Sequence, residues 1–143
     1  MIEVITIAHI AVAAAWFGHK LLIPRDVRVS VRKAESSRNL VGRMRRAQAL
    51  GLVAGVLTLG TGVWLVMLTT GFAEAPITIH IALGTVIAMF LVGFFVARPA
   101  WKRIEGAIDA EDTPAAVGGV SSFNRALNLE SLLWILALSM MIL

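Results

Sequence analysis

The sequence predicts an all-α integral membrane protein, a single domain folded as an up-down bundle of four transmembrane helices. Three observations support this prediction. Hydrophobic residues make up 58% of the 143 residues, the mean hydropathy is +0.83, and the apolar residues are collected in four long runs separated by charged segments. A soluble domain of this length could not bury so much apolar surface.

Each of the four runs is long enough to cross a bilayer, which takes about 20 mostly apolar residues because only a helix satisfies its own backbone in hydrocarbon. The predicted helices cover residues 2–23, 47–70, 76–97 and 123–143, and the basic connections are 24–46 and 98–122. Pro24 and Pro99 are expected to end the first and third helices, and Pro76 to occupy a first turn. Ser121 or Ser122 is expected to cap the fourth helix.

The distribution of positive charge predicts an N-out and C-out topology in a bacterial inner membrane. Residues 20–46 carry nine Lys and Arg residues, whereas the N-terminal turn and residues 69–79 carry none. Since Lys and Arg collect in cytoplasmic connections, both long connections should lie in the cytoplasm. Their helical stretches are expected to lie on anionic headgroups, followed in the second connection by a flexible turn at Pro114 and Gly118-Gly119.

The composition excludes several classes of chemistry. There is no cysteine, which removes disulfides, thiolate metal sites and thiol nucleophiles. The basic residues lie between apolar runs and are not interleaved with exposed aromatic residues, which argues against nucleic acid as a partner. The six methionines show no spacing typical of a copper site and are interpreted as apolar filler. Any metal site must therefore use histidine, methionine or carboxylate ligands.

Two histidines are placed where a membrane cofactor could use them. His9 lies about five to seven residues inside the first helix and His80 about four inside the third, counted from the same face. Imidazoles at equal depth on different helices suit bis-histidine ligation of heme b within a bundle. Trp16 shares a helical face with His9, and Gly84, one turn after His80, would let a flat ligand approach the backbone. Interhelical hydrogen bonding and contact with a quinone or a metal ion remain alternatives.

Two further features involve helix two and the cytoplasmic half of the bundle. Small residues form a stripe on helix two: Ala47, Gly51, Gly55, Thr58 and Gly62. Helix packing is the favoured interpretation of this stripe, and Gly55 is also a candidate wall of the porphyrin slot. His19, Asn128 and Glu130 could form a second polar layer that passes protons or binds a cationic group. A structural ion pair of Glu130 with Lys20 or Arg25 is the preferred interpretation.

The stretch AHIAVAAAWFGHKLLIPR contains His9, then Trp16, then Pro24-Arg25. It resembles the first helix of the bacterial membrane protoporphyrinogen IX oxidases of the HemJ type, in which His, six residues, Trp, seven residues and Pro-Arg follow one another. Arg125 and Asn128 in FNRALNLES are similar to the Arg-x-x-Asn that opens the last helix of that family. The segment GTGVWLVMLTTGF with the third helix is similar to small membrane proteins related to the CopD copper-resistance domain.

The oxidase resemblance implies heme b held by histidine in a four-helix bundle, and a redox role in late heme biosynthesis. We therefore expect a small heme b-binding membrane protein in which His9 and His80 ligate the iron, with Trp16, Gly55 and Gly84 around the porphyrin; whether it is an enzyme is left open. The alternative is a non-catalytic helical subunit or assembly partner of a larger membrane complex, or of a homo-oligomer. A copper-handling transporter is disfavoured because cysteine and ordered methionine ligands are missing.

Overall fold

The computed structural model describes residues 1–142, except the side chains of residues 34 and 35, and position 143 of the predicted fourth helix lies outside this range. The described chain is helical almost throughout. Its elements are α1 (Ile2–Ser30), α2 (Ala34–Leu68), α3 (Gly71–Glu74), α4 (Ile77–Val92), the π-helical segment η1 (Gly93–Ala97), α5 (Arg98–Asp109) and α6 (Thr113–Ile142). The segments α4, η1 and α5 follow one another without a break and form one rod.

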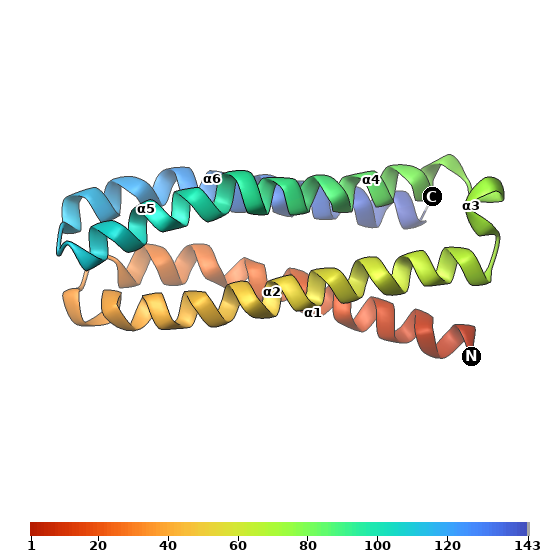
Figure 1. The fold of residues 1–143 in the computed structure, drawn as a ribbon, viewed down its shortest axis with the longest axis horizontal. Helices are drawn as coiled ribbons and strands as arrows, with labels where there is room; N and C mark the ends of the chain where they lie inside the picture. Colours follow the sequence, from red (N-terminus) through yellow and green to blue (C-terminus); the bar gives the residue numbers. More distant parts are fainter. Residues whose placement is uncertain (143) are drawn as a thin grey trace.

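The helices form two antiparallel hairpins that lie side by side, as Figure 1 shows. One hairpin is α1 with α2, and the other is the α4–η1–α5 rod with α6. Both termini and α3 lie at one end of the bundle, and the α1–α2 and α5–α6 connections lie at the other, which we call the basic end. Four helical stretches are long and apolar enough to cross a membrane: residues 2–30, 36–68, 77–109 and 113–142. The predicted four-helix architecture is thus present.

The helices extend beyond the predicted spans, and three predicted boundaries are wrong. Helix α1 continues through Pro24, the α4–η1–α5 rod continues through Pro99, and α6 begins at Thr113 rather than near Ser121. The expected flexible turn is also helical: Pro114 falls in the first turn of α6, where a missing N–H has no effect. Tertiary packing overrides these local signals because the connections carry apolar faces that can be buried against one another.

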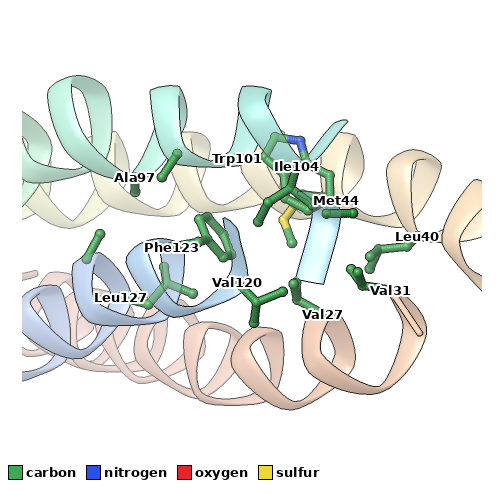
Figure 2. Packing of buried hydrophobic residues seen from close by; sticks show 13 residues of the cluster. Val27, Val31, Leu40, Met44, Ala97, Trp101, Ile104, Val120, Phe123 and Leu127 are labelled. Atoms are coloured by element: carbon green, nitrogen blue, oxygen red, sulfur yellow. The ribbon is translucent and has the colours of Figure 1, made fainter. Parts of the chain in front are cut away.

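The largest hydrophobic cluster lies toward the basic end, where Figure 2 shows side chains of α1, α2, α5 and α6 together. Its buried members are Val27, Val31, Leu40, Met44, Ala97, Ala100, Trp101, Ile104, Ala116, Val120, Phe123, Ala126 and Leu127. Trp101 and Ile104 belong to a stretch that was expected to lie on the membrane surface, yet they are 1% and 0% exposed within the bundle. A β-carbon at Gly119 would lie 2.8 Å from Ile104 Cγ1, so this glycine lets α6 approach α5 closely. The helical stretches of the connections therefore prolong the bundle.

Among the described side chains, three ion pairs neutralise part of the positive charge at the basic end, two of them between helices and one between a helix and the α5–α6 connection. They are Arg43–Asp26 at 2.8 Å, Arg45–Glu105 at 2.9 Å and Arg38–Glu111 at 2.7 Å. At least one side chain of each pair is well exposed, so each pair contributes at most about 1 kcal/mol to stability. Their main consequence is that the arginines they involve are already engaged by carboxylates.

Candidate functional site

A cavity of about 500 Å³ lies between the two hairpins. Its volume falls within the range of about 300–1,000 Å³ that is typical of small-molecule sites. Most of its wall is apolar, with four aromatic rings and two thioethers contributed by Trp16, Phe90, Phe94, Phe123, Met44 and Met89. The polar side chains in the wall are His19, Lys20, Arg45, Gln48, Arg98 and Glu130. Such a mixture, mostly apolar with a few polar groups, is the usual composition of a ligand site.

The mouth of the cavity opens between α2 and the η1–α5 stretch. The exposed side chains of the lining all come from these two segments, for example Leu52 of α2 and Phe94 of η1, whereas the lining residues of α1 and α6 are buried or half-buried. Helix α2 packs mainly on α1 and helix α4 mainly on α6, so the seam between α2 and α4 is the more loosely packed one. A molecule in the surrounding phase can therefore reach the cavity sideways.

An ion pair between Lys20 of α1 and Glu130 of α6 forms part of the cavity wall. The Glu130 side chain is 2% exposed and that of Lys20 is 15% exposed. A carboxylate at such a place needs a partner, because an isolated buried charge is strongly destabilised. The Lys20 ammonium also lies 4.9 Å from the centre of the Trp16 ring. The preferred interpretation of Glu130 as half of an ion pair is thus confirmed, with Lys20 as the partner.

The π-helical segment places a glycine directly against Glu130. The N–H of Arg98 donates to the carbonyl of Gly93, five residues earlier, which is the hydrogen bond of a π-helix. Pro99 has no N–H to continue the regular pattern at this point. A β-carbon at Gly93 would lie 2.9 Å from Glu130 Oε1. The segment therefore makes room for the carboxylate, and single π-turns of this kind often occur at functional sites.

One oxygen of the Glu130 carboxylate has no protein partner. Oε2 accepts the hydrogen bond from Lys20, whereas Oε1 accepts none from any described residue. Nearby, His19 Nε2 lies 2.9 Å from the backbone oxygen of Ala47, and since a carbonyl oxygen can only accept, this nitrogen is the donor. Asn128, the third member of the expected polar layer, is exposed and does not line the cavity. The cavity thus holds a carboxylate acceptor, an ammonium donor and an imidazole.

The small-residue stripe of α2 packs against rings from other helices. A β-carbon at Gly55 would lie 2.8 Å from Phe90 Cζ and 3.0 Å from Trp16 Cζ2, and one at Gly62 would lie 3.1 Å from His9 Cε1. The centroids of the Trp16 and Phe90 rings are 5.8 Å apart. These glycines therefore serve packing between helices of the chain, which is the favoured interpretation of the stripe. Of the predicted slot residues, Trp16 lines the cavity and Gly55 lies directly behind its wall.

His9 is buried and forms an interhelical hydrogen bond. Its Nδ1 lies 2.8 Å from Thr61 Oγ1 on α2. The Thr61 hydroxyl donates its only proton to backbone oxygens of its own helix, with Leu57 O at 2.7 Å, so it accepts from His9 Nδ1–H. His9 Nε2 is then the nitrogen with the free lone pair. This arrangement matches the hydrogen-bonding alternative, and it is also how proteins orient metal-binding imidazoles.

His80 occupies a different environment. It is exposed, its Nδ1 lies 3.3 Å from Pro76 O, and its ring centroid lies 6.5 Å from that of Phe72. Gly84 is exposed too, and a β-carbon there would meet nothing within 4 Å. Helices α1 and α4 are not among the closely packed pairs, and neither His9 nor His80 lines the cavity. The structure therefore gives the two histidines separate partners and does not unite them in a heme site.

Several cavity residues were not singled out from the sequence. Gly93, Phe90 and Arg98 are the clearest cases, since each looks like an ordinary residue of an apolar helix or its basic flank. The sequence signal that could have drawn attention to this place is Gly93 followed by Pro99 in one helix. A proline perturbs the helical hydrogen bonds of the preceding turn. Among the described residues, no group of three or more His, Asp and Glu side chains could hold a metal ion.

Comparison with family models, curated proteins and solved structures found no match for this chain. The similarity to membrane protoporphyrinogen oxidases consequently rests on the six residues quoted for it, and of these only Trp16 lines the cavity.

Proposed function

We propose that the protein is a multi-pass membrane protein that binds a largely apolar small molecule in the cavity between its hairpins. The observation that carries this proposal is the cavity of about 500 Å³ with the Lys20–Glu130 pair, whose carboxylate is buried, in its wall. Ionisable groups within membrane spans are costly and usually functional. An ion pair by itself requires neither the cavity beside it nor the π-helical segment that makes room for Glu130.

The proposed surroundings are a bacterial inner membrane with the basic end in the cytoplasm and both termini outside. The cations that flank both connections support this orientation through the positive-inside rule. The mouth of the cavity, between α2 and η1, would then face the bilayer in its cytoplasmic half. An apolar ligand could enter from the lipid without crossing water, and Arg45 and Arg98 would lie at the level of the headgroups.

The resemblance to membrane oxidases implies a more specific version of the proposed function, in which the ligand is heme b and the protein has a redox role. To hold heme b between them, His9 and His80 would both have to leave the partners that they have in the structure, Thr61 and Pro76. His19 is the imidazole that lines the cavity. An absorption spectrum of the purified protein decides whether a heme is bound, since a Soret band would be seen at once.

The proposal is tested by filling the cavity. A β-carbon at Gly51 would meet only His19 Nε2, at 4.0 Å, so a Gly51→Leu side chain can enter the cavity without striking backbone. Gly60 of the same helix has open space around it and is not part of the lining, which makes Gly60→Leu the matched control. Native mass spectrometry of protein released from lipid nanodiscs should detect a bound small molecule in the wild type and in Gly60→Leu, but not in Gly51→Leu. Equal retention by Gly51→Leu would overturn the proposal.

A further inference from the structure

We propose that the cavity recognises a neutral planar ring bearing hydrogen-bonding oxygens, of the quinone and hydroquinone class, whose apolar tail leaves between α2 and η1. This inference rests on the proposed function and specifies its ligand. It concerns binding alone, and no electron-transfer step is included.

The first argument is that a hydrogen-bond donor and an acceptor lie side by side in the cavity wall. The Lys20 ammonium has three N–H donors, of which one is used by Glu130 Oε2. Glu130 Oε1 accepts no hydrogen bond from the residues that the structure describes, and it faces Gly93. A quinone carbonyl can accept from the ammonium, and a hydroquinone hydroxyl can donate to the carboxylate. The same pair of side chains can therefore bind either oxidation state of such a ring.

The second argument concerns charge and excludes ionic ligands from the inner part of the cavity. An anion there would face the Glu130 carboxylate, and a cation would compete with Lys20 for it. Farther out, Arg45 is engaged by Glu105 at 2.9 Å. Arg98 lies 5.3 Å from the Phe94 ring and has no carboxylate partner among the described residues, so unbalanced positive charge is confined to the mouth. A neutral polar ring suits the inner part best.

The third argument is the shape of the apolar wall. The rings of Trp16 and Phe90 lie 5.8 Å apart at an interplanar angle of 31°, and Phe94 adds a third aromatic surface. Aromatic surfaces at such distances favour offset contact with another flat ring. Leu52 and Phe94, both more than half exposed, stand at the mouth and offer an apolar path for a tail into lipid.

The test compares two probes with the same tail and a flat six-membered ring with or without carbonyl oxygens, a decyl-substituted benzoquinone and decylbenzene, at equal mole fractions in nanodiscs. Native mass spectrometry measures how much of each stays bound. We expect the wild type to retain the quinone at least about tenfold more strongly, because hydrogen bonds to charged groups discriminate by that order. Gly51→Leu should lose both probes, and Gly60→Leu should behave as the wild type.

The double variant Lys20→Met with Glu130→Leu separates recognition from simple burial. It removes both charges at once, so no unpaired charge is left to unfold the bundle. We expect it to lose the preference for the quinone, so that it retains the two probes equally. A preference that persists in this variant refutes the inference. Equal retention of both probes by the wild type refutes the inference but not the proposed function, whereas retention of neither refutes the proposed function itself.

Discussion

Replacement of Glu130 by leucine is the substitution whose effect the structure defines best. The carboxylate is 2% exposed and is the partner that the described residues offer to the Lys20 ammonium. Leucine has a similar volume, so the main loss is the charge rather than the packing. The Lys20 ammonium would then be left against an apolar wall without a counter-ion.

The expected magnitude follows from the burial of both partners. Removing one partner of a buried ion pair costs about 3–5 kcal/mol. The Lys20 side chain is 15% exposed and can turn toward the mouth, so we expect the lower end of this range, about 3 kcal/mol. On the scale of soluble domains of similar size, this loss corresponds to a fall in unfolding temperature of roughly 6–12 °C.

The assay is thermal unfolding in a mild detergent, followed by circular dichroism, for a double-mutant cycle. Its members are the wild type, Glu130→Leu, Lys20→Met and the double variant. The double variant should unfold within about 1 kcal/mol of the wild type, because an apolar pair can replace a buried ion pair without loss. The reasoning is refuted if Glu130→Leu is as stable as the wild type, or if the double variant is as unstable as Glu130→Leu.

Three further predictions concern packing, orientation and the histidines. Gly55→Val should lower the free energy of unfolding by about 1–3 kcal/mol, since its side chain would strike two rings, while Gly60→Val should change it little in the same unfolding assay. Because the chain has no cysteine, a single introduced thiol can report topology: in intact cells a membrane-impermeant maleimide should label Ala73→Cys but not Lys102→Cys, and the reverse pattern would contradict the orientation. His80→Ala should alter neither the unfolding temperature nor any Soret band, because that ring is exposed; a Soret band that this variant abolishes would restore the bis-histidine site.

The four helices were predictable because a run of about 20 apolar residues can cross a bilayer only as a helix, and the chain has four such runs. The four apolar runs predicted four helices, and the structure has a helical stretch over each of these runs. Their ends were not predictable from Pro24 and Pro99. A proline removes one hydrogen bond from a helix, and the burial of residues such as Val27 and Trp101 in the basic-end cluster outweighs that loss.

The site was predictable only in part. Glu130 stood out because a carboxylate within an apolar run needs a partner, and Lys20 was one of the two partners considered. The cavity could not be foreseen, since it arises from the looser packing of α2 on α4 and from the π-helical turn at Gly93. The prediction that His9 and His80 share a ligand used only their equal depth along the helix axes and not the direction in which each ring points. It could not show that the first ring turns toward α2 and that the second is exposed.

The most direct measurement is a crystal structure of the wild type and of Gly51→Leu, both grown from a lipidic phase. We predict non-protein density in the wild type beside Trp16, Lys20 and Glu130, continuing toward the mouth between α2 and η1, and no such density in the variant. A wild-type cavity closed by its own side chains, or a ligand held instead between the rings of His9 and His80, would contradict the proposed site.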